Sequence, residues 1–596
     1  MRKLAIILGF LLSSAFGWNA AFSAFAQTTT PATPPGECRV RDYGAKGDGI
    51  AIDSAPINAA IESCHSRGGG TVLVDGGTFR SGTIRLLDNI TLKLEPGATI
   101  LGSDNLADYS HLPHPSEGRD SALIVAENVK NIAIVGEGTI DGNGRAFTEN
   151  GVPHFFPFFE TAATRQGEAY TARVSEGREG PVRMRDRPGN LILILHSDGI
   201  LLRDFHVLDS PNWSIHVACS NHVWVNGLDV RNSLLVPNSD AMDISGSSNV
   251  IIANCYLEAG DDGLVLGGPC ADGWCQQTAE NLTVSNLILH SRSSAIRVGP
   301  SAKGIRNLTV QNVVIKDSNR GINIQARASE VVEDLLFSNI VSETRLIDGP
   351  WWGSGEPVSM TVARWAYESW ADTPAQTAGR IRHVVFDNMV ANSQSPIVVY
   401  SSEPNHIEDI EFRNLHLTMQ SSPLQAILGG NLDLQPTTPL RLGMTRHDLS
   451  ALEVHGVRDF RIADLQVRWE GAFPEFYRNA IHAEYFDGLT VDGFRGQGSA
   501  PRFGAMFFEH GKNLSLHNAH ALSGALLQSD GSRRQRKPGR GCYVDVQQAE
   551  SGTIDLTGVD CDHKLCVHLQ GMVIVYLLTA YRLLGGCFPL LNLYLD

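Results

Sequence analysis

The sequence predicts an all-β protein built as a right-handed parallel β-helix, on two observations. Short segments in which apolar residues alternate with other residues recur through the middle of the chain, each followed by Asn, Gly or Asp. Such alternation is typical of strands with one buried face, and recurrence every 20 to 50 residues or so indicates a solenoid. Long helical patterns are absent, so the crossovers of a doubly wound α/β sheet have nothing to build them.

The repeated unit can be followed along the chain, because its clear copies step by 23 to 32 residues. These copies begin at Ile200, Val223, Val250, Leu282, Leu308 and Leu335. Further copies begin near Ile132, Val384, Ile410, Phe460, Leu489 and Leu514. The Asn or Gly after each strand suits a tight corner, and we expect the Asn side chains to form a ladder. A propeller fits poorly, since each blade needs about 40–45 residues and four strands.

Composition narrows the class of protein. The chain has 596 residues, a net charge of −16 and an apolar fraction of 42%. A solenoid grows by adding coils, so this length does not require several domains, and we expect a monomer. Phosphate binding depends on Lys and Arg, so the acidic balance argues against a nucleic-acid partner. The apolar runs are too short to span a bilayer, so no membrane partner is expected.

The N-terminus has the layout of a signal peptide. Arg2 and Lys3 precede an apolar run that ends at Phe16, and the small residues Ala24 and Ala26 offer a cleavage site before Gln27. We therefore expect a secreted or periplasmic protein. The predicted organisation is a signal peptide (1–26), a linker (27–36), a parallel β-helix catalytic domain (37–566) with an insertion (144–188), and an atypical apolar C-terminal tail (567–596).

Ten cysteines are compatible with disulfides in such a compartment. The spacing suggests pairs between Cys270 and Cys275 and between Cys561 and Cys566, with Cys38 and Cys64 as a third. None has the Cys-x-x-Cys spacing of a zinc site, so we expect no structural metal and no cofactor.

Three aspartates are the candidate catalytic residues. Asp240 lies 21 residues before the adjacent pair Asp261 and Asp262, which is nearly one repeat of the solenoid. Coils stack about 4.8 Å apart, so these carboxylates should meet on one wall. Paired carboxylates carry out acid–base hydrolysis of glycosidic bonds, and a gap of about 6.5–9.5 Å between them leaves room for a water and predicts inversion.

Several motifs occur in order along the chain: Val40–Asp48, Gly136–Gly144, Ser210–His216, Asn238–Asp243 and Gly260–Gly263. Together they resemble the polygalacturonases of glycoside hydrolase family 28, of the bacterial type, over residues of about 38 to 420. The resemblance implies a secreted inverting hydrolase on a right-handed β-helix, acting on a pectin-like polysaccharide. It also implies that Asp261 is the general acid and that Asp240 and Asp262 hold and deprotonate the attacking water.

The chain departs from the family pattern at three positions. Ser294 stands where the family has a histidine, while Asn323 and Gln325 stand where it has the Arg and Lys that grip a uronate carboxylate. Neutral amides lose those charge-assisted hydrogen bonds. We therefore expect a different linkage, in a branched pectin or a partly neutral glycan. Three arginines could restore the charge from new positions: Arg297, Arg320 and Arg327.

A Gly-rich loop, 349–357, is similar to a loop of bacterial family members. Trp351 and Trp352 are expected to stack on sugar faces, with Glu356 as a hydrogen-bonding partner; the alternative is that both rings pack the loop. His216 is a further candidate for substrate binding, or a satisfied residue within a turn. For Asp243 we favour a structural role.

Two alternatives to a hydrolase stay open. The first is a polysaccharide lyase, in which the acidic cluster would bind calcium, although the cationic base is missing from its place. The second is a non-catalytic carbohydrate-binding solenoid, in which the aspartates merely stabilise corners.

Overall fold

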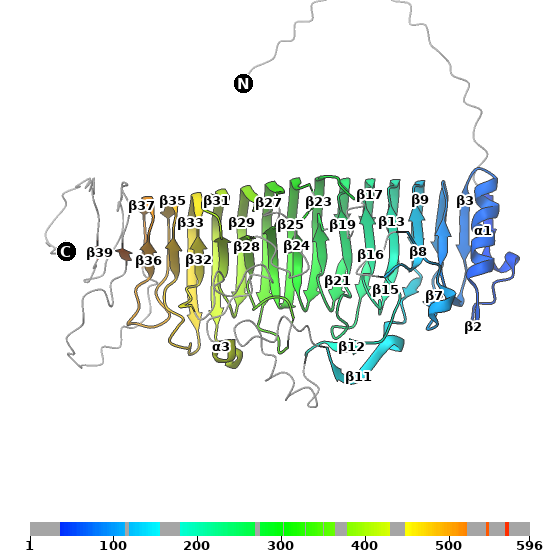
Figure 1. Ribbon diagram of the computed structural model, residues 1–596, viewed down its shortest axis with the longest axis horizontal. Coiled ribbons are helices and arrows are strands. Elements are labelled where there is room, and N and C mark those ends of the chain that lie inside the picture. The colour runs from blue at the N-terminus through cyan, green and yellow to red at the C-terminus, as the bar shows by residue number, and fades with distance from the viewer. Residues whose placement is uncertain are drawn as a thin grey trace, which may run out of the picture.

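The computed structural model describes residues 36–113, 119–154, 179–268, 275–301, 303–327, 329–349, 351–363, 378–428, 447–520, 544–547 and 567–570. These residues form an elongated right-handed parallel β-helix, as predicted (Figure 1). The predicted signal peptide, nearly all of the linker and most of the tail lie outside the described residues.

Two long parallel sheets form the walls of the solenoid. Sheet A has 22 strands: β1 (Gly36–Arg39), β2 (Asp48–Ile52), β3 (Gly70–Val74), β4 (Gly77–Ser81), β6 (Ile90–Leu94), β7 (Ala98–Gly102), β9 (Lys130–Gly136), β10 (Thr139–Asp141), β14 (Asp198–Arg203), β15 (His206–Leu208), β17 (Asn221–Asn226), β18 (Asp229–Arg231), β20 (Ser248–Ala253), β21 (Tyr256–Ala259), β23 (Ala279–Ser291), β25 (Ile305–Ser318), β27 (Val331–Thr344), β29 (Arg380–Ser393), β31 (Ile407–Gln420), β33 (Val457–Glu470), β35 (Asp487–Asp492) and β37 (Lys512–His517).

Sheet B, which carries the candidate site, has 15 strands: β5 (Ile84–Leu86), β8 (Ala122–Glu127), β13 (Asn190–Leu195), β16 (Ile215–Ala218), β19 (Met242–Ser245), β22 (Leu264–Leu266), β24 (Ser294–Val298), β26 (Arg320–Ala326), β28 (Val358–Val362), β30 (Ile397–Ser401), β32 (Leu452–His455), β34 (Ile481–Glu484), β36 (Met506–Glu509), β38 (Val544–Gln547) and β39 (Val567–Gln570). Because β39 pairs with β38 in parallel, the solenoid extends into the segment predicted as a tail.

Equivalent positions of the predicted repeat pair with each other in sheet A. Val250 pairs with Leu282, Leu282 with Leu308, and Leu308 with Leu335, so the apolar positions stack inward coil after coil. Their side chains are at most 2% exposed. Each such burial contributes about 1.5–3 kcal/mol relative to an exposed side chain, which is why the inward alternation fixes the coil register.

The predicted asparagine ladder is confirmed at one corner of sheet A. Asn286, Asn312 and Asn339 all have a positive φ, between 55° and 58°. Each donates its side-chain amide to the carbonyl oxygen of the Asn on the preceding coil, at 3.0, 3.3 and 3.2 Å. Asparagine tolerates the left-handed backbone, and its amide both donates and accepts, so one residue type serves the turn and the stack.

The sequence analysis missed a helix. α1 (Ser54–Ser66) lies at the N-terminal end of the solenoid, where it covers the first coils (Figure 1). Ile57, Ala60 and Ile61 on it are fully buried. The open end of the core needs such a cover, and 13 residues were too few to stand out against the strand repeat.

The remaining elements are short. Residues in the predicted insertion form a two-stranded antiparallel sheet of β11 (Thr148–Pro153) and β12 (Val182–Met184). The others are α3 (Pro423–Leu428) and the 3-10 helices η1 (Val40–Tyr43), η2 (Leu106–Asp108) and η3 (Gly144–Phe147). Among the described residues, no helix has the length and apolar character needed to cross a bilayer.

Two disulfides are present among the described residues. Cys38 bonds to Cys64, with an S–S distance of 2.06 Å, as expected. Cys275 bonds to Cys219 rather than to Cys270, so the prediction of a Cys270–Cys275 pair is wrong. Coil stacking brings together sulfurs 56 residues apart, which sequence proximity could not suggest. The predicted pair of Cys561 and Cys566 lies outside the described residues.

Candidate functional site

The site lies on the outer face of sheet B. Side chains alternate along each strand, so Met242, Leu264 and Ile296 point into the core and are fully buried. The positions that follow them face outward and are in register from coil to coil. This outward row contains His216, Asp243, Val265, Arg297, Asn323, Ser359, Val398, Glu453, His482 and Phe507.

The structure brings the three predicted aspartates together at the start of these strands. Asp240 precedes β19, and Asp261 and Asp262 precede β22 on the next coil. The pairing of the two strands sets Asp240 beside Asp262, and the Ala241 amide donates to the Asp262 carbonyl at 3.0 Å. Each aspartate offers an oxygen within 4.8 Å of the other two, and all three are at most 6% exposed.

The distance expectation needs correction. The nearest oxygens of these carboxylates lie within 4.8 Å, which is closer than the expected gap of about 6.5–9.5 Å. The aspartates occupy adjacent coils and neighbouring positions rather than a long diagonal across the wall. The spacing therefore does not by itself support inversion.

Glycines on both sides of the Asp261–Asp262 pair allow the coils to approach. A Cβ at Gly263 would lie 2.7 Å from the carbonyl oxygen of Ala295, and one at Gly260 would clash with the carbonyl oxygen of Val236. The backbone amides of the neighbouring coils then reach the carboxylates. Ser294 N donates to Asp262 Oδ1 at 2.9 Å, which fixes the orientation of that carboxylate.

Burial and mutual repulsion set the protonation of the cluster. Burial, followed by the neighbouring Asp262 carboxylate, raises the pKa of Asp261 to about 7. Burial also raises the pKa of Asp240 well above its usual value, and Asp261 and Asp243 add to the rise. Arg297 Nε lies 3.0 Å from Asp262 Oδ2, which places a cation against that carboxylate. The cluster thus sets carboxyl groups with raised pKa values beside one that is paired with a guanidinium, an arrangement suited to acid–base chemistry.

The departures from the family pattern form one connected change. Asn323 Nδ2 donates to Ser294 Oγ at 3.2 Å, so the two neutral replacements bond to each other. Arg297 is in register with Asn323 on the adjacent coil, and it is the only Lys or Arg among the ten row positions named above, from His216 to Phe507. Gln325 is buried at 1% exposure, two residues further along the same strand.

The other two arginines do not restore charge at the site. Arg320 is fully buried and forms an ion pair with Glu356 at 3.2 Å. Arg327 is also fully buried and donates to the Thr361 carbonyl at 2.7 Å. Both guanidiniums hold coils together, so the suggestion that they serve the site is wrong.

His216 lies on the outward row beside Asp243 and is only 1% exposed. Its Nε2 is 3.1 Å from Ser245 Oγ, and its ring meets the edge of Trp213 at 5.0 Å. Burial lowers the pKa of His216 to about 3, so the ring is neutral. A buried neutral ring fits a supporting role under Asp243, and its contact with substrate stays a prediction.

The Gly-rich loop is packed more tightly than expected. Trp351 is 3% exposed, and its indole donates to the Glu179 carbonyl at 2.7 Å. Glu356 is 1% exposed and also accepts from the Ser354 amide at 2.7 Å. Trp352 is half-buried. Packing therefore explains Trp351 and Glu356, while the sugar contact of Trp352 stays a prediction.

The sequence analysis missed a tether at the end of the insertion. Glu179 accepts from Arg345 Nη1 at 2.8 Å and from Arg292 Nη2 at 3.2 Å. Both arginines lie beside the ends of sheet-A strands, more than a hundred residues away in the sequence. These ion pairs fix the end of the insertion at Glu179 next to Trp351. No local sequence pattern predicts contacts between residues so far apart in the chain.

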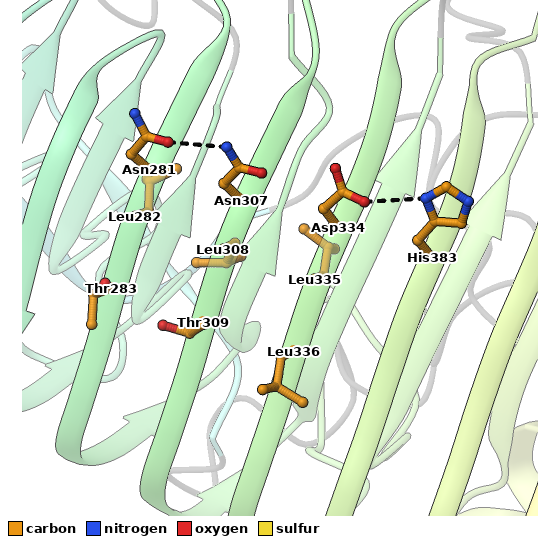
Figure 2. Close-up of a pocket in the computed structure, with 10 residues that line it drawn as sticks. All are labelled: Asn281, Leu282, Thr283, Asn307, Leu308, Thr309, Asp334, Leu335, Leu336 and His383. Atoms are coloured by element: carbon orange, nitrogen blue, oxygen red, sulfur yellow. Dashed lines mark hydrogen bonds and ion pairs between the residues drawn. The ribbon is translucent and has the colours of Figure 1, made fainter.

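Two other features of the surface resemble binding sites. The three aspartates could hold a divalent cation through their oxygens, which is the basis of the lyase alternative. A shallow pocket of about 340 Å³ lies on the outer face of sheet A (Figure 2). Its polar lining consists of ladder pairs such as Asn281 with Asn307 and Asp334 with His383. These satisfied, exposed pairs do not form a buried acid–base set.

Comparisons with known proteins agree with the fold and with the family resemblance. The sequence profile "Glycosyl hydrolases family 28" matches residues 165–429. An exo-poly-alpha-D-galacturonosidase of Dickeya chrysanthemi is 26% identical over 324 residues, which is 50% of this chain and 53% of that protein. An endo-polygalacturonase of Pectobacterium carotovorum subsp. carotovorum is 23% identical over 57% of this chain and 79% of that protein. The chain spans about half the length of the first of these relatives.

Among solved structures, a family 28 exopolygalacturonase of Yersinia enterocolitica has the same fold. It superposes with a TM-score of 0.54 at 18% identity, over 77% of this chain and 78% of that one.

Proposed function

Because residues 165–429 match the profile of glycosyl hydrolases family 28, we propose that the chain is a member of this family and hydrolyses glycosidic bonds of a pectin-type polysaccharide. One observation carries this proposal: three buried aspartates offer oxygens within 4.8 Å of one another on the outer face of the β-helix. Burying like charges this closely is costly unless some of them are protonated or paired. A site that acts as acid and base is where such an arrangement is expected.

In the proposed reaction, Asp261 gives its proton to the leaving oxygen. Its pKa of about 7 keeps it protonated in mildly acidic solution. Asp262, which forms an ion pair with Arg297, takes the proton of the attacking water, and Asp240 holds that water by a hydrogen bond. The bond between the sugar carbon and the bridging oxygen breaks as the bond to the water oxygen forms. One proton enters and one leaves the aspartate cluster, so the balance closes.

The proposal includes inversion of the anomeric centre. Its support is the match of all three aspartates to the family positions. The compact cluster is also compatible with one attacking water, because two hydrogen bonds of about 2.7–2.8 Å reach oxygens roughly 4–5 Å apart. NMR of the first-formed anomer tests this part, and a product that retains the configuration would contradict it.

The proposed substrate is a branched or partly neutral pectin rather than plain polygalacturonan. The cation of the outward row, Arg297, is engaged by Asp262 at 3.0 Å. Asn323 and Ser294 bond to each other. A uronate carboxylate in the site would thus compete with Asp262 for the same guanidinium, which weakens its charge-assisted recognition.

The test is sugar release from polygalacturonate, rhamnogalacturonan, arabinan and galactan, with Asp261→Asn as the matched inactive control. We expect turnover on branched or neutral polymers and weak turnover on polygalacturonate. Robust hydrolysis of polygalacturonate would overturn the altered specificity but keep the hydrolase. An ultraviolet-absorbing unsaturated product would identify a lyase. Binding that is unchanged in Asp261→Asn, without turnover by either protein, would identify a binding solenoid.

We also propose that the protein is secreted or periplasmic, on the signal-like N-terminus. N-terminal sequencing of the protein recovered from its natural host tests this. A mature chain that begins near Gln27 is expected, and a chain that retains Met1 in the cytoplasm would contradict it.

A further inference from the structure

A cluster of two histidines and two glutamates lies in the C-terminal coils. Glu453 in β32 and His482 in β34 are in register on the outward row, Glu509 ends β36, and His447 precedes β32. Five strands of sheet B lie between β32, which carries Glu453, and β19, which carries Asp243, so six coil spacings separate the two residues. At about 4.8 Å per coil, the cluster lies roughly 25–30 Å from the aspartates, which is too far to take part in hydrolysis.

The donor atoms of this cluster converge. His447, Glu453 and His482 each offer one ligand atom within 4.8 Å of the others. Glu453 and His482 are 2% and 6% exposed, and Glu453 Oε2 lies 2.8 Å from His482 Nδ1. The ring of His447 stacks over that of His482, with centroids 5.9 Å apart. Two imidazoles and a carboxylate are the donor set of many zinc sites that keep a fourth position open.

A second layer already supports the central histidine. His482 Nε2 lies 3.0 Å from Glu509 Oε1, and the ring of Phe507 stacks on His482 at 5.1 Å. The backbone amide of Ser450 donates to Glu453 Oε1. Metal-bound histidines usually donate their other N–H to a carboxylate, which fixes the ring and raises its basicity. Here Nδ1 faces Glu453 while Nε2 is held by Glu509.

We propose that His447, Glu453 and His482 form a binding site for a divalent transition metal of the zinc type, with Glu509 as the positioning residue. Imidazole with carboxylate suits zinc better than calcium, which prefers oxygen ligands. A metal here joins the segment before β32 to the coils of β32 and β34. It therefore stabilises the C-terminal coils of the solenoid. The sequence analysis predicted no metal because it considered only cysteine spacing.

The competing occupant of this cluster is a proton. Burial lowers the pKa of His482, but Glu453 and Glu509 outweigh it and raise that pKa to about 10. Without a metal, an imidazolium between two carboxylates satisfies the same groups. A measurement of metal binding separates these two states.

The experiment is calorimetric titration of the metal-stripped full-length protein with Zn²⁺, with Ca²⁺ as the comparison ion. One Zn²⁺ per chain, a higher unfolding midpoint and weaker binding of Ca²⁺ are expected. His447→Ala removes one ligand but leaves the contacts of His482 with Glu453 and Glu509, so it should fold normally. It should weaken Zn²⁺ binding at least about tenfold, and Glu509→Gln by about 10- to 100-fold.

The matched control is His383→Asn. His383 is exposed and bonds to Asp334 at 3.1 Å on sheet A (Figure 2), so it offers a surface His–carboxylate pair. Zinc binding should be unchanged in this variant. Absence of saturable binding, binding that survives His447→Ala, or loss of binding in His383→Asn would each overturn the proposal and leave the protonated His482 as the occupant.

Discussion

The asparagine ladder of sheet A and the aspartate cluster beside sheet B stack the same kind of side chain in two chemical forms. In the ladder, Asn388 donates to Asn339 at 2.7 Å and accepts from Asn414 at 3.0 Å. In the cluster, Asp240 and Asp262 lie on adjacent coils, and their carboxylates can only accept. Stacking satisfies the amides, whereas it forces the carboxylates to capture a proton or a cation.

The difference between the two stacks shows how this fold can create a reactive site from its ordinary stacked positions. The repeat supplies identical positions on successive coils, and amides there extend the solenoid without strain. Where carboxylates stack instead of amides, as in the aspartate cluster, like charges on adjacent coils repel each other. The proton on Asp261 and the guanidinium of Arg297 reduce this repulsion between the carboxylates.

The largest expected effect is on activity. Asp261→Asn restores amide chemistry within the cluster and removes the proton donor. Turnover should fall by about 10²- to 10⁴-fold, the usual contribution of a general acid, while binding of the polysaccharide is retained. Initial rates and binding of the preferred polymer, with Asp243→Asn as the comparison, measure this. Near-normal turnover in Asp261→Asn would show that the cluster is only a corner.

The same substitution should change how stability depends on pH. The pKa of Asp261 is raised in the folded state to about 7 from 3.8. Its contribution to stability is therefore complete below about pH 4 and is lost as the pH rises through 7. Asp261→Asn should be more stable than the wild type at pH 8, by roughly 4 kcal/mol at most. Denaturant unfolding at pH 4 and pH 8 checks this, and an equal difference at both pH values would contradict it.

Removing the positive charge of Arg297 should raise the pKa values of Asp240 and Asp261 in the cluster. Arg297 lowers the pKa values of Asp240 and Asp261. Arg297→Gln should therefore move the acidic limb of the pH–rate profile upward and reduce activity by about 10- to 100-fold, because the ion pair with Asp262 is lost. Arg297→Lys keeps the charge and should keep the profile. An unchanged profile in Arg297→Gln would remove Arg297 from the electrostatic account.

The smallest effect is expected in the ladder. Asn388→Asp keeps the acceptor for Asn414 but loses the donation to Asn339. It should destabilise the protein by about 0.5–1.5 kcal/mol at pH 7. The loss should shrink below about pH 4, where a neutral carboxyl can donate again. Asn388→Ala, which has no such group, should show no recovery, and equal behaviour of the two variants would break the comparison.

The local pattern of the sequence determined the solenoid, its asparagine ladder and the meeting of Asp240 with Asp261 and Asp262. The pattern could do so because the inward-facing apolar residues fix the register between strands. The register then determines which residues of adjacent coils lie side by side. The altered site was inferred from the family resemblance rather than from the repeat, through Ser294 and Asn323 on adjacent coils.

Only the tertiary structure decided contacts between residues that no repeat relates. It paired Cys219 with Cys275, tied Glu179 to Arg345, and buried Trp351 beneath the returning insertion. It also chose Arg297, and not Arg320, as the partner of the aspartates. Loops of variable length make these contacts, and the repeat does not predict their path. It also does not predict how deeply each titratable group is buried, which sets its pKa.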